Sequence, residues 1–274
     1  MRILLTNDDG VSSPGLHALK AALDPLGEVV VIAPDRNRSA IARAITIHGP
    51  LTVKTVVLPD GSTAHATDGT PVDCVRLAAA GLVGAPPDLV MSGINLGLNV
   101  GDDVAYSGTV GAAIEGLLIG LPAIAVSTQM TGTLEERFRP DYYDFGAVAR
   151  AAAALVPRVL DEDFPAGVLL NLNAPALSPA AITGAVVTRL GRRIYRDRLD
   201  LVEGDATDGR YRLYGEDVWH SGDPRTDLSA IDRGEISVTP LHYDLTETDV
   251  ADLMGVWTLE GLHLGPAAAE ALDV

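Results

Sequence analysis

Cysteine is nearly absent from this chain of 274 residues, since Cys74 is the only one. A single cysteine excludes any disulfide within the chain, which suits a protein built for a reducing compartment. Cys74 lies in an apolar helical pattern, so we expect its side chain to be packed in the core.

Positive charge is also scarce. The chain has 20 Lys and Arg against 37 Asp and Glu, a formal net charge of −17 at pH 7. Because no general basic field can replace counterions, a nucleic-acid polymer is not expected as a partner. Small anions can still bind where the charge is locally reversed, although solvated loops have the same composition. The arginines gather in two segments, Arg36, Arg38 and Arg43 in the first and Arg189, Arg192, Arg193, Arg196 and Arg198 in the second.

Long apolar runs are missing as well. The longest, 110–126, contains Glu115, Pro122 and three glycines, so it predicts a helix followed by a strand and not a membrane span. The apolar run at 3–5 is too short to be the core of a signal peptide. We therefore expect a cytoplasmic protein with no membrane partner.

Short apolar runs alternate with amphipathic segments through the first half of the chain. The runs have the character of parallel strands buried on both faces, and the segments between them carry apolar residues at helical spacing. This alternation predicts an α/β fold with a doubly wound, mostly parallel, Rossmann-like sheet. The expected strands are 3–6, 29–33, 89–92 and 123–127, and the expected helices begin near Pro14, Pro71, Val110 and Phe145.

Other β-rich segments depart from this alternation. The segment 45–58, closed by the turn 59–62, predicts an inserted hairpin at the periphery. We expect the whole chain, 1–274, to be one domain, with 1–165 as its core and about 185–245 as a β-rich arm that contacts another subunit. After residue 167 the pattern predicts strands at 168–172, 185–190, 211–219 and 235–241, and a helix at 267–272.

Two adjacent carboxylates, Asp8 and Asp9, follow the first expected strand. Like charges held close raise each other's pKa, and burial raises both, unless a cation or several hydrogen-bond donors compensate. A hard divalent metal ion is one solution. The alternative is that the pair caps the turn or helix that follows, where Asp is favoured for its side-chain acceptor.

The loops after the strands offer further oxygen ligands. In an open parallel sheet these loops gather at the carboxyl ends of the strands, where ligands bind. Ser39 follows the second strand and Asn95 the third, so both are expected beside Asp8 and Asp9. Together they form a hard oxygen shell suited to Mg²⁺ or Mn²⁺, whereas zinc would need His or Cys. Taken singly, Ser39 and Asn95 are equally typical of turns.

A glycine-rich loop occupies residues 93–113. Gly93, Gly97 and Gly101 do not have the spacing of a dinucleotide-binding loop. The turn Ser107–Thr109 directly precedes an expected helix, where free N–H groups and the helix dipole favour a bound anion. The alternative is a Ser/Thr cap followed by close glycine packing. A metal and an anion pocket in one crevice favour phosphate chemistry.

Six motifs in order along the chain resemble the SurE family, the stationary-phase survival proteins that are metal-dependent nucleotidases. They are Ile-Leu-Leu-Thr-Asn-Asp-Asp-Gly at 3–10, Ala-Pro-Asp-Arg-Asn-Arg-Ser at 33–39, Gly-Thr-Pro-Val-Asp-Cys-Val at 69–75, Pro-Asp-Leu-Val-Met-Ser-Gly-Ile-Asn at 87–95, Tyr-Ser-Gly-Thr-Val-Gly-Ala-Ala at 106–113 and Ser-Val-Thr-Pro-Leu at 237–241.

The resemblance implies one divalent metal ion per subunit, Mg²⁺ or Mn²⁺, with Asp8, Asp9, Ser39 and Asn95 as its ligands. It also implies hydrolysis of nucleoside 5′- or 3′-monophosphates to nucleoside and phosphate, with release of phosphate from polyphosphate in some members. Homodimers or homotetramers built partly through the C-terminal β arm are typical of the family. One departure is visible: members usually read Arg-Ser-Gly, whereas Ala40 follows Ser39 here.

The expected mechanism assigns a role to each motif. Asp8 or Asp9 would act as the catalytic residue that orients an attacking water. Asn99 and the turn Ser107, Gly108 and Thr109 would hold the non-bridging phosphoryl oxygens through N–H donors.

Three other classes compete with this interpretation. A haloacid-dehalogenase-type phosphatase needs a second Asp two positions after the first, where Gly10 stands. A receiver-type signalling module needs a lysine after a late strand, and the only lysines are Lys20 and Lys54. A protein that binds nucleotides without turnover is compatible with the motifs, and steady phosphate release would exclude it.

Overall fold

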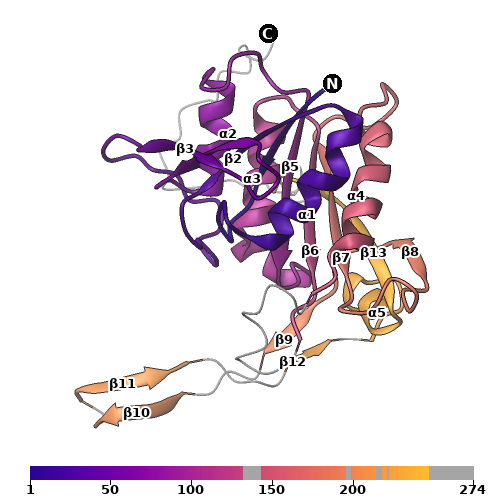
Figure 1. Cartoon of the computed structure of the whole chain (residues 1–274). Helices are drawn as coiled ribbons and strands as arrows, with labels where there is room; N and C mark the ends of the chain where they lie inside the picture. Colours follow the sequence, from indigo (N-terminus) through magenta and orange to yellow (C-terminus); the bar gives the residue numbers. More distant parts are fainter. Residues whose placement is uncertain (132–142, 196–198, 206, 214–217, 221, 247–274) are drawn as a thin grey trace, which may run out of the picture. The chain divides into compact units, whose positions relative to one another are not determined.

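A nine-stranded sheet organises the protein (Figure 1). The computed structural model describes residues 1–131, 143–195, 199–205, 207–213, 218–220 and 222–246. The strand order is β3-β4-β2-β1-β5-β6-β7-β13-β8, and the strands from β4 to β7 run parallel. This topology confirms the predicted doubly wound α/β fold. The central strands are β1 (Arg2–Thr6), β2 (Glu28–Pro34), β5 (Leu89–Leu96), β6 (Ala123–Thr128) and β7 (Val168–Ala174).

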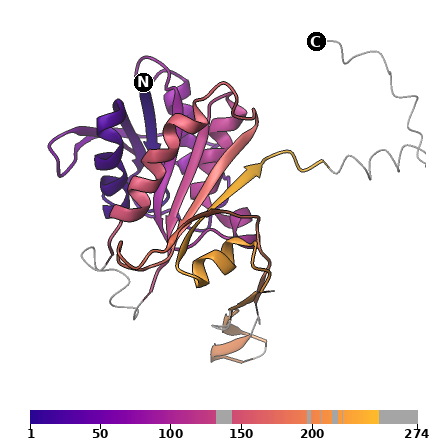
Figure 2. The same ribbon diagram turned by 90° about the vertical axis from the view of Figure 1, so that its right-hand side faces the viewer.

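Helices cover both faces of the sheet (Figures 1 and 2). On one face α1 (Pro14–Leu23) packs beside α4 (Gly146–Val159), and on the other α2 (Pro71–Ala79) packs beside α3 (Gly108–Leu118). The starts match local signals, because Pro14 and Pro71 occupy first-turn positions that need no N–H donor. At α2, Thr70 and Asp73 also form a capping box. Two short 3₁₀ helices, η1 (Asp24–Leu26) and η2 (Gly101–Tyr106), follow α1 and β5.

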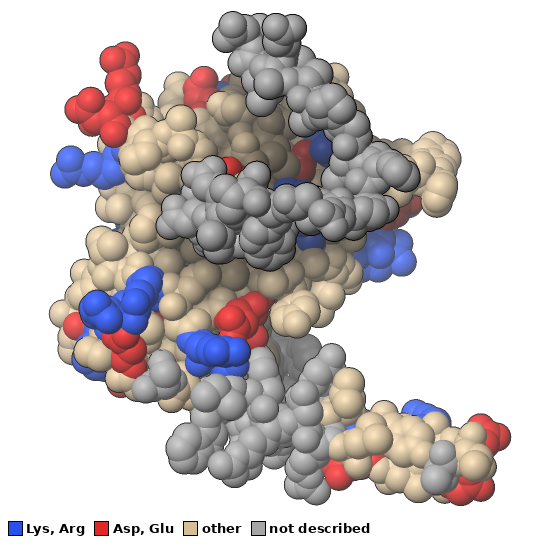
Figure 3. All heavy atoms as spheres, turned by 180° about the vertical axis from the view of Figure 1, so that it is seen from behind, with Lys and Arg blue, Asp and Glu red and all other residues tan. Residues whose placement is uncertain are grey.

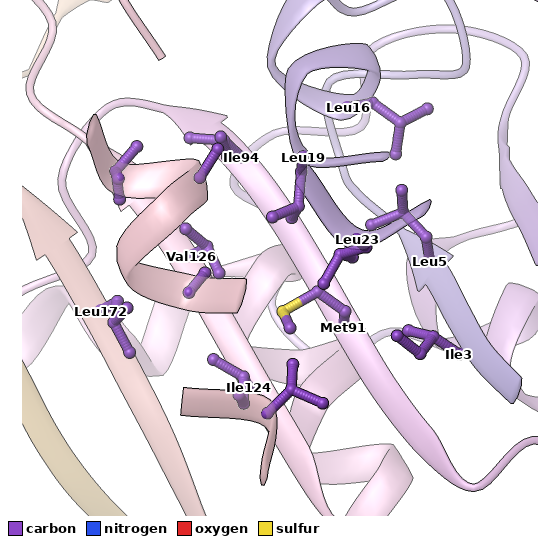
Figure 4. Close-up of a cluster of buried hydrophobic side chains, with 14 of the residues drawn as sticks. Ile3, Leu5, Leu16, Leu19, Leu23, Met91, Ile94, Ile124, Val126 and Leu172 are labelled. Atoms are coloured by element: carbon purple, nitrogen blue, oxygen red, sulfur yellow. The ribbon is translucent and has the colours of Figure 1, made fainter. Parts of the chain in front are cut away.

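Apolar side chains fill the layers between sheet and helices. On the α1 side, Leu16, Leu19 and Leu23 are fully buried and point toward Leu5 and Met91 of the sheet (Figure 4). These leucines recur at positions that share one helical face, so the pattern seen in the sequence is the pattern that packs. The rigid centre of the sheet therefore supports the loops at the carboxyl ends of its strands.

The edge of the sheet corrects one prediction. The strands of the inserted hairpin are β3 (Val53–Val57) and β4 (Thr63–Thr67), joined by the expected turn, so the hairpin begins at Val53 and not at residue 45. Gly49 has φ 89°, and Pro50 lacks an N–H, so the chain before β3 cannot continue a ladder. Moreover, β4 pairs with β2, which makes the hairpin the edge of the main sheet.

The predicted arm segment, 185–245, contains two kinds of strand. The main sheet includes β8 (Gly184–Val187) and β13 (Glu235–His242), and β13 runs antiparallel to β7. Apart from it lie two small antiparallel pairs, β9 (Arg193–Tyr195) with β12 (Val218–His220) and β10 (Asp200–Gly204) with β11 (Gly209–Arg212). A short helix, α5 (Asp227–Asp232), was not predicted. The helix expected at 267–272 lies outside the described residues.

Backbone contacts divide the chain after His242, and all described helices and strands belong to the unit Met1–His242. The assignment of 1–165 to the core and of about 185–245 to subunit contacts stays a prediction. No helix in the described part of the chain is both long and apolar enough to cross a bilayer.

Charged side chains of both signs are interspersed on the face shown in Figure 3, and no continuous basic field is visible there.

Candidate active site

The side chain of Asp8 links the end of β1 to the start of α3 by hydrogen bonds. The residue is only 3% exposed. Its Oδ1 accepts a hydrogen bond from the Thr109 hydroxyl at 2.7 Å, and its Oδ2 accepts one from the Thr109 N–H at 3.1 Å. A Cβ at position 108 would lie 2.9 Å from Asp8 Oδ2, so Gly108 allows this close approach. Asp8 therefore contacts the first turn of α3 and does not cap α1, the helix that follows it in sequence.

The side chain of Asp9 links the end of β1 by hydrogen bonds to its two neighbours in the sheet, β2 and β5. Its Oδ1 accepts from Asn37 Nδ2 at 3.0 Å, and its Oδ2 accepts from the N–H of Leu96 at 3.0 Å. Asn37 follows β2 and Leu96 ends β5. The loops after three strands thus converge on two adjacent carboxylates, as the position of the motifs predicted.

The pair is electrostatically costly without a cation. Burial raises the pKa of Asp8, and the hydrogen bonds from Thr109 oppose that rise only in part. Burial also raises the pKa of Asp9 to about 7, and the neighbouring charge of Asp8 adds to the effect. A positive charge beside the two carboxyl groups would favour their ionised forms.

Ser39 lies in the loop after β2, and the two residues before it, Asn37 and Arg38, bond to Asp9 and Asp8. The N–H of Arg38 donates to the backbone carbonyl of Asp8 at 2.6 Å, and the N–H of Ser39 donates to Asn37 Oδ1 at 2.9 Å. Ser39 is exposed. Ala40 has φ 59°, a left-handed conformation that glycine adopts more easily. The residue at which the sequence departs from the family pattern therefore holds a conformation that is more costly for alanine than for glycine.

Asn95 lies near the end of β5 and is 9% exposed. Its Nδ2 donates to the carbonyl of Gly97 at 2.7 Å, so this bond fixes which end of the amide is the acceptor. The next residue, Leu96, carries the N–H that binds Asp9. Asn95 is therefore one residue from a direct contact with the carboxylate pair.

The donor set fits a hard divalent cation. Asp8, Asp9, Ser39 and Asn95 offer carboxylate, hydroxyl and amide oxygens, which suit Mg²⁺ or Mn²⁺. Among the residues that the structure describes, no group of three or more His, Cys, Asp or Glu could hold a metal ion. A shell of two carboxylates completed by neutral oxygens is consistent with that result, and zinc is disfavoured by the lack of nitrogen and sulfur ligands.

The predicted phosphate contacts have different local roles. Ser107 is the N-cap of α3, and its hydroxyl accepts from the N–H of Val110 at 3.0 Å. Both donors of Thr109, its hydroxyl and its N–H, are directed at Asp8. Asn99 is 7% exposed, and its Nδ2 donates to the Ser127 hydroxyl at 2.8 Å. The turn at the start of α3 thus borders Asp8, with Thr109 bonded to it directly, whereas the amide of Asn99 is bonded to Ser127.

Sequence reasoning missed three polar residues that hold the loop after β5. Asn171 and Asn173 of β7 donate to the carbonyl of Asn99 at 2.8 and 3.0 Å. Asp227 of α5 accepts from the N–H of Gly101 at 2.8 Å. The available signal was the pair of amides in the otherwise apolar run Val-Leu-Leu-Asn-Leu-Asn-Ala.

Comparison with known proteins matches this architecture. The sequence profile of the family described as Survival protein SurE matches residues 3–197. The proteins named 5′-nucleotidase SurE from Rubrobacter xylanophilus and Herpetosiphon aurantiacus are 47% and 46% identical, covering 97% and 91% of this chain and 98% and 95% of their own. The crystal structure of SurE protein from Aquifex aeolicus is similar with a TM-score of 0.75 and 38% identity, covering 93% of this chain and 98% of that one. The carboxylate pair, the fold and these matches together show that the chain belongs to the SurE family.

Proposed function

We propose that the protein is a metal-dependent 5′-nucleotidase, a phosphoric monoester hydrolase that converts nucleoside 5′-monophosphates to nucleoside and phosphate. The observation that carries this proposal is the adjacent pair of the buried Asp8 and the half-buried Asp9, with Asp8 bonded to the first turn of α3. That arrangement combines a cation site with a helix N-terminus, the two features that bind phosphate oxygens. Relatives at 46–47% identity that bear the name 5′-nucleotidase SurE support the same activity.

The ligands proposed for the metal are Asp8, Asp9, Ser39 and Asn95, which would hold one Mg²⁺ or Mn²⁺ per subunit. When bound, such an ion neutralises phosphoryl oxygens and lowers the pKa of a coordinated water. The carboxylate of Asp8 or Asp9 would orient the attacking water toward the phosphorus atom.

The substrate phosphate is proposed to lie against Asn99, Ser107 and Gly108, with the Asn99 side-chain amide, the Ser107 hydroxyl and the Gly108 N–H as its donors. Such donors stabilise charge on the phosphoryl oxygens without having to reorganise during the reaction. Thr109, which was predicted as a fourth phosphate contact, would act chiefly by holding Asp8, because both of its donors already point there.

Nucleoside 3′-monophosphates and polyphosphate are further candidate substrates, since the proposed contacts address the phosphoryl group and not the base. Nucleic-acid polymers are not proposed, given the net charge of −17.

Assembly into a homodimer or homotetramer is proposed through the hairpin β10–β11. The hairpin and its flanks expose apolar side chains that a second copy could cover. The exposed fractions are 65% for Leu199, 48% for Leu201, 55% for Val202, 43% for Tyr211 and 50% for Leu213.

The decisive experiment is a phosphate-release panel. Nucleoside 5′- and 3′-monophosphates, polyphosphate and a small aryl phosphate are each assayed with Mg²⁺, Mn²⁺ or a chelator. We expect turnover of 5′-monophosphates that is lost in chelator and restored by added metal. Turnover unaffected by chelator would refute the metal site. Nucleotide binding without phosphate release would favour the alternative of a binding or receiver-like signalling protein.

A further inference from the structure

Two asparagines in β7 pair with the backbone of Asn99 from the other side of β6. Asn171 and Asn173 are fully buried. Both donate from Nδ2 to the Asn99 carbonyl, at 2.8 and 3.0 Å, and Asn173 Oδ1 also accepts from the Asn99 N–H at 2.8 Å. Asn173 therefore satisfies both backbone groups of Asn99, as a neighbouring strand would.

The segment that contains Asn99 needs such support. Residues 97–100 lie between β5 and η2 and belong to no helix or strand. Buried backbone groups outside regular structure must find partners elsewhere. The side chain of Asn99 is fixed in addition by its bond to Ser127, which lies beside Asn173 in the sheet register. Asn99 is thus held at its N–H, its carbonyl and its amide.

The two amides interrupt an otherwise apolar strand. The neighbouring residues Leu169, Leu170 and Leu172 are buried and apolar, and a polar side chain in such a strand is costly unless it is hydrogen-bonded. Within the described residues, Asn171 Oδ1 is buried and has no hydrogen-bond partner. An unsatisfied buried acceptor destabilises the fold. The two buried amides therefore hold Asn99 in place, and they do so at a cost to the packing of β7.

We propose that Asn173, assisted by Asn171, is a positioning residue that sets the Asn99 amide for phosphate recognition. The inference rests on the proposed contact between Asn99 and the substrate phosphate. The hydrogen bonds of Asn171 and Asn173 go to Asn99 and not to Asp8 or Asp9, so we expect their effect on the phosphate side of the site.

The test is Asn173→Asp, which keeps the shape of the side chain. One carboxylate oxygen still accepts from the Asn99 N–H, whereas the other replaces a donor and faces the Asn99 carbonyl. With a small aryl phosphate as substrate, we expect the inhibition constant of inorganic phosphate and the KM to rise about tenfold or more. The concentration of Mn²⁺ that gives half-maximal activity should change less than about twofold. A parallel loss of phosphate and Mn²⁺ affinity would overturn the proposal, because general damage to the site gives that result.

Two further variants keep the outcomes distinct. Asn171→Leu removes one donor to the Asn99 carbonyl and leaves Asn173 intact, so it should raise the phosphate inhibition constant less than Asn173→Asp does. If Asn173→Asp fails to fold, Asn171→Leu tests the proposal in its place. Ser237→Ala is the matched control, since Ser237 is buried beside Asn173 but bonds to Thr188 at 2.9 Å. We expect its kinetics to be unchanged.

Asn99→Ala separates this inference from the proposed function. An unchanged phosphate inhibition constant in Asn99→Ala would refute the phosphate role of Asn99 itself. A rise in Asn99→Ala without a rise in Asn173→Asp or Asn171→Leu would refute the positioning role alone.

Discussion

The candidate active site and the hairpin β10–β11 use their side chains in opposite ways. In the candidate site, polar groups such as Asp8 and Asn99 are buried and bonded within the chain. In the hairpin, apolar groups such as Leu201 and Tyr211 are exposed, and within the described residues its two strands pair with each other alone. The polar groups of the site thus find their partners inside the subunit, whereas the apolar groups of the hairpin remain exposed.

Asp8→Asn is the change expected to have the largest effect on this comparison. It removes the negative charge from a proposed metal ligand while keeping its shape. Loss of partners behind metal ligands already costs about 10–100-fold, so we expect phosphatase activity to fall by at least about 100-fold at saturating Mn²⁺. Phosphate release and calorimetric Mn²⁺ binding measure the effect. Full activity in this variant would show that the pair is not the metal site.

Leu201→Glu tests the hairpin half of the comparison. If the hairpin is an interface, a charge in its covered surface should weaken association by about tenfold or more. Light scattering over a dilution series would show a lower molar mass than for the unmodified protein. The matched control is Val187→Glu on β8, which is 80% exposed and lies outside the hairpin. An equal effect of both substitutions, or of neither, would contradict an interface at the hairpin.

Thr109→Val is expected to have a moderate effect. The substitution deletes the hydroxyl that binds Asp8 and keeps the branched shape and the backbone N–H bond. We expect about tenfold weaker Mn²⁺ activation, because partners behind a ligand orient it. Thr188→Val is the control, since the Thr188 hydroxyl is also buried but bonds to Ser237 and Thr239. Unchanged activation in Thr109→Val would argue that the carboxylate pair needs no support from α3.

Ala40→Gly should have the smallest effect. Ala40 has φ 59°, and glycine relieves the strain of that conformation, although it gives the unfolded chain more freedom. We expect the free energy of unfolding to rise by up to about 1 kcal/mol with little change in activity. Ala44→Gly serves for comparison. Ala44 does not have a positive φ, so glycine there should lower the free energy of unfolding. Urea denaturation measures whether the free energy of unfolding rises in Ala40→Gly and falls in Ala44→Gly.

Much of the fold, and the grouping of the segments at the carboxylate pair, could be predicted because their signals are local. Asp8 and Asp9 directly follow an apolar strand, Ser39 lies after a second and Asn95 lies near the end of a third, so the parallel-sheet rule was enough to group these segments. The hairpin was misplaced because β-rich composition at 45–52 suggested a strand, whereas Gly49 and Pro50 interrupt the ladder.

The roles of Thr109, Asn171 and Asn173 could not be predicted in the same way. Each depends on a contact between segments separated by 72 to 101 residues in the chain. Propensity and periodicity act over a few residues, so they carry no information about which distant donor reaches a given acceptor.

The sequence by itself determined the strand and helix alternation, the net negative charge and the carboxylate pair, because these follow from composition and from patterns within single elements. The tertiary structure alone decided that Thr109 holds Asp8, that Asn173 pairs with Asn99 and that the hairpin β3–β4 extends the main sheet. These features arise only when packed strands bring distant polar groups into buried surroundings, where each donor must find an acceptor.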